Sequence, residues 1–265
     1  MTIRLLQTGA HSAAWNMALD EVLIERIAAG LSEPCLRFYT WKPSAISIGY
    51  FQSLEAEVDL AKCRELGIDV VRRQTGGGAV FHDDEVTYSM HLPLSAPPER
   101  LETSGRVGDL VPLKILESYE KICSAIIRGL AELGIQSEFV PLNDILVSGQ
   151  KISGNAQTRK RGVLLQHGTI LKSVDVDTMF ELLKVPDEKL KGKLIQDVKQ
   201  RVTSVNAHSG GRFSTQGITD ALIRGFEKEF SELQFTSSEI NQEEQLEAEK
   251  LGQEKYSQSS WNLQR

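Results

Sequence analysis

Apolar and polar positions alternate along the chain with two different periods, which predict a mixture of helices and strands. Apolar residues recur every three or four positions over 14–29, 113–133 and 217–230, the spacing of amphipathic helices. Gly30 and Gly134 follow two of these segments, where glycine commonly ends a helix. A shorter helix is predicted near 55–66. Strand-like runs of β-branched, aromatic and alternating apolar residues cover 35–39, 45–50, 86–92, 139–147, 151–157 and 162–171.

Two segments depart from this pattern. Residues 95–112 are rich in Pro, Ser, Gly and charge and predict a mobile loop excursion. The last thirty residues, 236–265, are rich in Glu and Gln and predict an acidic helical tail after a larger unit at 1–235. Such a run is most often a solvated helix face. Trp261 in this tail is expected to anchor it to the rest of the protein rather than to contact a ligand.

Composition narrows the class of protein. The chain has 265 residues, of which 40% are hydrophobic and 25% charged, which suits one large globular domain with at most a small appendage. The net charge of −6 argues against a dedicated nucleic-acid binder. No apolar run approaches the roughly 18 residues that span a bilayer, so we expect no membrane association. The first residues lack a signal-peptide core, and a cytoplasmic location is therefore expected.

The most informative segment is 72–82, where Arg72 and Arg73 lead into three glycines, Gly76 to Gly78, and a histidine, His82. Glycines between two strands cost conformational entropy, and a common reason for them is close approach of the backbone to a ligand. Arginine supplies fixed charge and a two-pronged donor for carboxylate or phosphate. The segment therefore predicts an anion-binding loop. A glycine-rich hairpin turn with two surface arginines is the alternative.

This loop lacks the features of two familiar nucleotide-binding loops. A Walker loop ends in Gly-Lys-Ser/Thr, whereas this one continues as Gly78-Ala79-Val80. A dinucleotide fingerprint opens a helix, and no helical period follows here. Neither a P-loop NTPase nor a Rossmann enzyme is therefore supported.

The loop resembles that of the lipoate-protein ligase and octanoyltransferase family, which belongs to the biotin/lipoate protein ligase superfamily. Further motifs of the family fall in the same order and extend the resemblance from about residue 5 to the end: 37–41, 48–52, Asn143-Asp144, 149–154 and 166–171. The resemblance implies an α+β fold, with a central mixed, largely antiparallel β-sheet flanked by helices, like that of class II synthetases. Residues 1–235 would form the catalytic domain, without the accessory C-terminal domain of single-chain ligases.

Lys151 is the residue to which the resemblance assigns the central chemical role. In this family the matching lysine contacts both the acyl carboxylate and the α-phosphate of ATP. A fixed cation there assists adenylation because charge builds on the α-phosphate in the transition state. Strand alternation places Lys151, Ser153 and Asn155 on one face and Ile152 on the other. A solvated lysine at a strand edge is the alternative.

The family pattern also implies a set of ligand contacts. Asp144 is expected to hold the Mg²⁺ that accompanies ATP, since Mg²⁺ takes one or two carboxylates from proteins; ordinary turn chemistry is the alternative for the Asn143-Asp144 pair. The implied ATP and adenylate contacts are Arg73, Gly76, Gly77, Gly78, Ala79, Val80, Phe81, Asn143, Asp144 and Lys151. The implied lipoate contacts are Arg72, Gly77, His82, Lys151, Ser153, Gly154, His167 and Gly168.

The two histidines and the apolar residues near them leave alternatives open. Each histidine is more often a structural residue than a catalyst, and the ligase reaction does not require a histidine base. Apolar candidates for an acyl tunnel are equally well explained by core packing: Val80, Ile48, Leu165 and Ile170.

The cysteines separate the two chemistries of the family. Octanoyltransferases move the acyl group through a cysteine thioester, and one subfamily carries that cysteine after the long helix. This chain has Cys35, Cys63 and Cys123 and none later. Cys123 lies on the apolar stripe of the predicted long helix and is expected to be buried and inert. The missing nucleophile favours ATP-dependent ligation.

The length resembles that of the large catalytic subunit of the bipartite, archaeal-type ligase, which works with a separate accessory small subunit. The implied acceptors are lipoyl-domain proteins, namely the E2 component of 2-oxoacid dehydrogenases and the glycine cleavage H protein. An acyltransferase that moves octanoyl or lipoyl groups between carrier proteins remains an alternative function. A non-catalytic module that binds lipoate or lipoyl-adenylate is a third.

Overall fold

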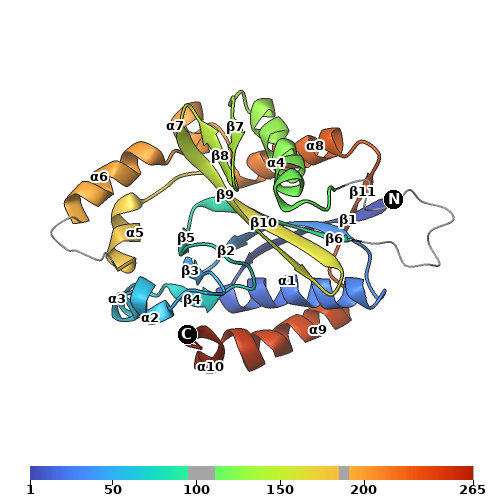
Figure 1. The fold of residues 1–265 in the computed structure, drawn as a ribbon, viewed down its shortest axis with the longest axis horizontal. Coiled ribbons are helices and arrows are strands. Elements are labelled where there is room, and N and C mark those ends of the chain that lie inside the picture. Colours follow the sequence, from blue (N-terminus) through green and yellow to red (C-terminus); the bar gives the residue numbers. More distant parts are fainter. Residues whose placement is uncertain (95–110, 185–190, 265) are drawn as a thin grey trace.

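An eight-stranded mixed β-sheet forms the centre of the computed structural model, which describes residues 1–94, 111–184 and 191–264 (Figure 1). The strand order is β11-β1-β2-β6-β10-β9-β8-β7. Within this sheet, only the β11-β1 and β1-β2 pairs are parallel. The strands are β1 (Thr2–His11), β2 (Cys35–Trp41), β6 (Glu85–Pro93), β7 (Glu138–Val140), β8 (Asp144–Val147), β9 (Gln150–Lys160), β10 (Val163–Leu171) and β11 (Gln234–Ser238).

A second sheet of three strands lies beside the first and carries the glycine-rich segment. It consists of β3 (Ala45–Ile48) between β4 (Asp69–Arg72), which is parallel to it, and β5 (Val80–His82), which is antiparallel. The glycine-rich segment joins β4 to β5, the two edge strands. The prediction of an α+β protein with a mixed, largely antiparallel central sheet is confirmed.

Helices cover both faces of the main sheet, as Figure 1 shows. α4 and α8 pack on one face, and α1 and α9 lie on the other. The helices are α1 (Ala13–Ala28), α2 (Leu54–Glu57), α3 (Leu60–Leu66), α4 (Ile115–Glu132), α5 (Val176–Leu182), α6 (Lys191–Arg201), α7 (Val205–Ser209), α8 (Thr215–Glu229), α9 (Gln242–Leu251), the π-helical turn η4 (Gly252–Tyr256) and α10 (Ser259–Asn262). No helix among these described segments is both long and apolar enough to span a membrane.

Two glycines bring α4 and α8 into backbone contact. A Cβ on Gly225 would lie 2.2 Å from the Ala125 carbonyl oxygen and 2.5 Å from the Gly129 nitrogen. A Cβ on Gly129 would lie 2.8 Å from the Leu222 Cα. Side chains at these two positions would force the helices apart, so the large core beneath them depends on both glycines.

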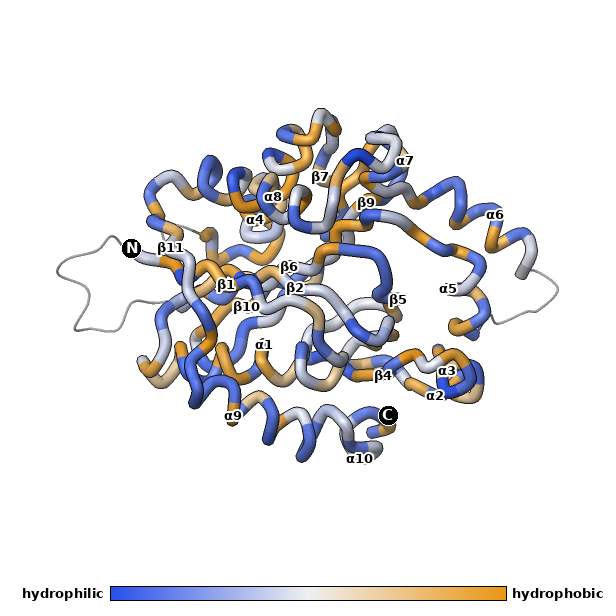
Figure 2. Tube along the Cα trace, turned by 180° about the vertical axis from the view of Figure 1, so that it is seen from behind, coloured by the Kyte–Doolittle hydropathy of each residue, from blue (hydrophilic) through white to orange (hydrophobic). Residues whose placement is uncertain are grey.

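The chain after β11 wraps back along α1 as α9, η4 and α10. The boundary expected between residues 235 and 236 falls inside β11, which pairs with β1 in the main sheet. Figure 2 shows hydrophilic residues along much of α9, consistent with its acidic sequence. Residues 95–110, most of the loop excursion predicted from composition, lie outside the described residues.

Candidate functional site

A cavity of about 300 Å³ opens where the two sheets meet. Its lining comes from strands of both sheets, from the glycine-rich segment and from helices that include α5. The lining residues are Met17, Tyr39, Trp41, Ser47, Arg73, Gly77, Gly78, Ala79, Val80, Phe81, His82, Thr87, Asn143, Lys151, Gly154, Asn155, Ala156, His167, Gly168, Thr169, Leu171, Val174, Met179 and Val202. Among these residues are Arg73 and Lys151 as cations but no carboxylate, so the cavity is suited to an anion.

The glycine-rich segment crosses closely over the end of β3. Gly77 has a φ of 100°, a region that favours glycine, and a Cβ there would lie 2.9 Å from the Arg73 guanidinium. A Cβ on Gly49 would lie 2.0 Å from the Gly77 carbonyl oxygen, so this crossing requires glycine on both sides. Gly76 and Gly78 have free space around their Cβ positions. Any intolerance of side chains at Gly78 would therefore have to come from a bound ligand.

Arg73 holds the loop from beneath. Its guanidinium donates to the carbonyl oxygens of Gly76 and Gly78, both at 2.8 Å, and to that of Ser47 at 3.0 Å. The residue is 5% exposed, and no described carboxylate lies within ion-pairing distance of it. Burial lowers the pKa of Arg73 to about 10, which leaves it charged at neutral pH. A buried, unpaired cation beside a cavity favours a negatively charged ligand.

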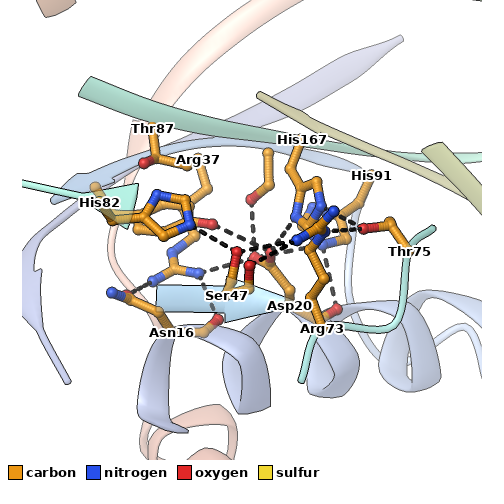
Figure 3. Close-up of polar contacts among 12 residues, drawn as sticks. Asn16, Asp20, Arg37, Ser47, Arg73, Thr75, His82, Thr87, His91 and His167 are labelled. Carbon is orange, nitrogen blue, oxygen red and sulfur yellow. Dashed lines mark hydrogen bonds and ion pairs between the residues drawn. The ribbon is translucent and has the colours of Figure 1, made fainter. Parts of the chain in front are cut away.

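A histidine relay connects Arg73 to the buried Glu85 carboxylate on one side, and Figure 3 shows Arg73, Ser47 and His82 of this relay. His82 Nδ1 lies 2.7 Å from Glu85 Oε1, and His82 Nε2 lies 2.7 Å from the Ser47 hydroxyl. In the neutral ring, Nδ1 donates to Glu85 and Nε2 accepts from Ser47. The Ser47 oxygen in turn accepts from Arg73 at 3.2 Å. Trp41 stacks on the His82 ring, with 4.0 Å between the ring centroids.

A second relay of the same kind reaches Arg73 from the main sheet (Figure 3). His167 Nδ1 lies 3.5 Å from Asp20 Oδ2, and His167 Nε2 lies 2.7 Å from the Thr75 hydroxyl. Thr75 Oγ1 accepts from Arg73 Nε at 3.2 Å. Burial lowers the pKa of His167 despite the raising effect of Asp20, so the ring is neutral. Both predicted histidines, His82 and His167, line the cavity. Each has hydrogen-bond partners that fix the orientation of its ring.

Asp20 anchors the second relay deep in the protein. Its Oδ1 lies 2.8 Å from an Arg37 guanidinium nitrogen and accepts from the Ser89 hydroxyl at 2.9 Å. Burial alone would raise the pKa of Asp20, but the His167 hydrogen bond and the Arg37 charge hold it well below its ordinary value. The arginine of the 37–41 motif is thus part of the buried support of the site (Figure 3).

Lys151 projects into the cavity from β9. Its ammonium lies 2.7 Å from Asp144 Oδ1 on the neighbouring strand β8. A Cβ on Gly154 would lie 2.8 Å from both Lys151 Nζ and Lys151 Cε. The glycine therefore leaves the space that the ammonium occupies, which gives a physical reason for the Lys-x-x-Gly spacing.

A β-bulge at Ile152 overturns the expected alternation of β9. Lys151 pairs with Leu146 and Ser153 with Ile145, so one extra residue lies between these pairs. As a result Lys151 shares a face with Gly154. Ser153 lies on the opposite face with Ile145, which belongs to the core beneath α4. The prediction that Lys151 and Ser153 share a face was wrong, because a bulge cannot be recognised from alternation alone.

Most of the residues implied by the sequence motifs meet at the cavity, but not all. Those that line it are Arg73, Gly77, Gly78, Ala79, Val80, Phe81, His82, Asn143, Lys151, Gly154, His167 and Gly168. Arg72, Gly76, Asp144 and Ser153 do not line it. The Arg72 guanidinium instead donates to main-chain carbonyls on the far side of the loop, so its position does not support a lipoate contact. Asp144 reaches the site through Lys151.

Several residues that line or support the cavity were not identified from the sequence. Ser47 and Thr75 are ordinary small polar residues whose role depends on contacts between distant segments. Glu85 lies three residues after His82, and this short spacing is a signal that could have been found. Among the acyl-tunnel candidates, Val80 lines the cavity, whereas Ile48, Leu165 and Ile170 belong to the hydrophobic cores.

The cysteines lie away from this cavity. Cys35, Cys63 and Cys123 are all buried, and none is among the lining residues. Burial raises the pKa of Cys63 to about 11 and that of Cys123 to about 12, and it raises the pKa of Cys35 well above its ordinary value. The prediction that Cys123 is buried is confirmed. All three thiols are uncharged at neutral pH and cannot serve as thiolate nucleophiles in this state.

Asp144 lies beside the cavity, next to Lys151, and its carboxylate is the candidate metal ligand. Asp144 is the one predicted metal ligand, and the described residues contain no cluster of three or more metal-binding side chains. Mg²⁺ commonly takes one or two protein carboxylates and completes its shell with phosphate oxygens and water. Asp144 fits that requirement. Lys151 pairs with its Oδ1, so its Oδ2 is left to coordinate a metal ion.

Comparisons with known proteins give a consistent family. The model of the lipoyl protein ligase A/B catalytic domain matches residues 12–227. Octanoyltransferase LipM of Brevibacillus brevis is 35% identical over 285 residues, covering 99% of this chain and 99% of that protein. This alignment is longer than the 265 residues of the chain, so it includes positions that the chain lacks.

Solved structures of lipoate-protein ligases are similar over the same length. The bipartite lipoate-protein ligase of the archaeal lipoylation system of Thermoplasma acidophilum has a TM-score of 0.85 and 31% identity, covering 99% of this chain and 96% of that chain. A lipoate-protein ligase A bound with ATP has a TM-score of 0.80 and 29% identity, covering 99% of both chains. The resemblance drawn from the sequence motifs is confirmed.

Proposed function

Because the chain belongs to the family of lipoyl protein ligase A/B catalytic domains, we propose that it is the catalytic chain of an ATP-dependent lipoate-protein ligase. It activates lipoate or octanoate as the acyl-AMP. It then transfers the acyl group to a lysine of a lipoyl-domain protein.

The observation that carries this proposal is the position of the three cysteines. A thioester route needs a thiolate that reaches the acyl donor. Cys35, Cys63 and Cys123 are buried, have raised pKa values and do not line the cavity. The cavity instead presents Lys151 and Arg73, the two cations that a reaction between a carboxylate and a triphosphate needs.

The shape and polarity of the cavity fit an acyl carboxylate. Its volume of about 300 Å³ lies within the range of small-ligand sites. Its lining includes several apolar side chains, namely Met17, Trp41, Leu171, Val174 and Met179. An eight-carbon chain would lie against these side chains, with its carboxylate toward Lys151.

The proposed reaction has two steps. In the first, a carboxylate oxygen of the acyl group attacks the α-phosphorus of ATP, an O–P bond forms, and the bond to pyrophosphate breaks. Lys151 stabilises the charge that develops on the α-phosphate, and the Arg73 charge favours binding of the anions. In the second, the amine of the acceptor lysine attacks the acyl carbon and AMP leaves, with loss of one proton from the nitrogen. Asp144 would hold the Mg²⁺ that neutralises the triphosphate.

The proposed partners follow from the relatives. The archaeal neighbour is described as a bipartite ligase with its E2 lipoyl domain. We propose lipoyl domains of 2-oxoacid dehydrogenase E2 and the glycine cleavage H protein as acceptors for this chain. A small accessory subunit is proposed as the second component, by analogy with that neighbour.

A second candidate function is octanoyl transfer between carrier proteins. It is favoured by the relatives named octanoyltransferase, which are about as similar in sequence as the archaeal ligase. This reaction would use an octanoyl carrier protein as donor and no nucleotide. It would require either a substantial rearrangement that exposes a cysteine or a different nucleophile.

An ATP–pyrophosphate exchange assay distinguishes the candidates. The protein, with and without an accessory subunit, is incubated with Mg²⁺, ATP, labelled pyrophosphate and octanoate or lipoate. We expect exchange that depends on the acid, resists iodoacetamide and is lost in Lys151→Ala. Octanoyl transfer from a carrier protein without ATP, blocked by iodoacetamide, would overturn the proposal in favour of the transferase. Binding of lipoate without either activity would indicate a non-catalytic module.

A further inference from the structure

The C-terminal tail ends against the strand that carries the anion-binding loop. α10 packs beside β4, although their residues are about 190 positions apart in the sequence (Figure 1). The contact is centred on Arg72, the last residue of β4 and the neighbour of Arg73. Arg72 and Arg73 therefore serve two different sides of the same loop.

Trp261 and Asn262 bond both main-chain groups of Arg72. The Arg72 N–H donates to Asn262 Oδ1 at 2.8 Å, and Trp261 Nε1 donates to the Arg72 carbonyl oxygen at 2.9 Å. The Arg72 side chain bonds the same two residues, because its guanidinium donates to the carbonyl oxygens of Trp261 and Asn262 at 3.1 and 2.8 Å. Four hydrogen bonds thus join the end of the chain to one residue.

The same guanidinium also holds the turn beneath the loop. Its third nitrogen donates to the carbonyl oxygens of Gly49, Tyr50 and Gln52, at 3.2, 2.9 and 2.7 Å. This turn contacts the loop directly. Tyr50 N–H donates to the Thr75 carbonyl oxygen at 2.9 Å, and Gly49 lies against Gly77. A continuous set of hydrogen bonds and contacts therefore runs from the tail through Arg72 to the loop.

The tail has independent anchors elsewhere. Glu244 in α9 accepts two hydrogen bonds from Arg4 on β1, at 2.6 and 2.9 Å. Lys255 and Tyr256 both donate to Glu21 on α1, each at 2.6 Å. These contacts hold α9 and η4 without involving β4, so the last residues can be altered while the rest of the tail remains in place.

We infer that Trp261 and Asn262 are positioning residues for the anion-binding loop, acting through Arg72. They fix the end of β4, and with it the place at which Arg73 and the glycines enter the cavity. They touch no ligand themselves, because neither lines the cavity. The inference holds whether the acyl group is activated by ATP or taken from a carrier protein, since both reactions use the same loop.

The test compares two tail variants with a matched control. Trp261→Phe removes the indole N–H and keeps an aromatic ring, and Asn262→Leu removes the amide at similar size. Glu244→Gln weakens a buried contact of the same tail with β1 and leaves Arg72 untouched. Deuterium exchange of the full-length, ligand-free protein is followed in peptides covering 73–80 and 242–251, with melting temperatures measured in parallel.

We expect Trp261→Phe and Asn262→Leu to speed exchange at 73–80 about tenfold and to leave 242–251 protected, since one lost hydrogen bond corresponds to about a factor of ten in a local equilibrium. Octanoate should bind about fivefold to tenfold more weakly by calorimetry, for the same reason. Glu244→Gln should lower the melting temperature without changing exchange at 73–80.

The inference is overturned if exchange at 73–80 stays at the wild-type rate in both tail variants. It is equally overturned if Glu244→Gln accelerates exchange there as much as they do, because the tail would then act only through global stability. The exchange measurement needs no ligand, so its outcome is separate from that of the ATP–pyrophosphate assay.

Discussion

Replacing Gly154 by alanine tests how the Lys151 ammonium is placed. The new Cβ would lie 2.8 Å from Lys151 Nζ and Cε, whereas ordinary van der Waals contacts begin near 3.4 Å. The ammonium must therefore move by about 0.6 Å or more. The lysine side chain is 40% exposed and flexible, so the move should cost little stability. The melting temperature should change by no more than a few degrees.

The catalytic effect should be much larger than the effect on stability. A misplacement of about 1 Å in a reacting geometry can cost about 100-fold in rate. Complete loss of one preorganised charge costs about 3 kcal/mol, or about 100-fold or more. Gly154→Ala should therefore lower the rate of octanoate-dependent ATP–pyrophosphate exchange about tenfold to 100-fold, and Lys151→Ala should lower it by at least as much.

A double-mutant cycle tests whether the glycine acts through the lysine. If it does, adding Gly154→Ala to Lys151→Ala should cost nothing further, since the group that it displaces is already gone. The assay is the exchange rate of the two single variants, the double variant and the wild type, with melting temperatures as a control. A double variant that loses the product of both factors would refute the reasoning, because the new methyl would then be acting on the ligand itself.

Three further predictions concern other parts of the molecule. Gly77→Val should weaken octanoate and ATP binding together in calorimetry, since a side chain there would need a strained φ and would meet Arg73; normal binding with a lower melting temperature would make the loop a simple turn. Gly225→Ala should lower the free energy of unfolding in urea by about 2 kcal/mol or more, because its Cβ would lie 2.2 Å from a carbonyl oxygen of α4; an unchanged midpoint would contradict this close helix contact. Burial lowers the pKa of His91 to about 4 from 6.5, so its contribution to stability is complete above pH 6.5 and is lost as pH falls toward 4, by up to about 3 kcal/mol. His91→Gln should flatten that part of the pH profile of unfolding, and an equally steep profile would show that another group is responsible.

Much of the fold was predictable because its signals are local. The periods of apolar residues gave helices close to α1, α4 and α8 and strands close to β2, β6 and β10. Partition of the strands into two sheets was not predictable, since β3, β4 and β5 look like any other short apolar runs. β11 was also missed, because its sequence, Gln234–Ser238, is largely polar and it pairs with β1 from the opposite end of the chain.

The residues of the site also fall into a group that was predictable from local sequence and a group that was not. Arg73, Lys151 and the glycines could be found because they stand in short motifs. The support beneath them could not, because it joins residues far apart in sequence: Thr75 meets His167 across 92 positions. For Arg72 the motif suggested a ligand contact that the structure does not support. Arg72 belongs to the motif, yet its contacts lie with the tail and the turn at 49–52 rather than with the cavity.

The bulge at Ile152 has a consequence for how such chains can diverge. Three positions separate Lys151 from Gly154, and the two residues share a face only because the bulge accommodates one extra residue between them. Regular pairing of the same residues would turn the lysine toward the apolar layer under α4, while every motif residue would still be present. Loss of one residue at the bulge would instead leave the lysine on its present face. Changes that remove the bulge without shortening β9 are therefore the ones most able to separate family resemblance from activity. An alignment that scores only matching residues would overlook them.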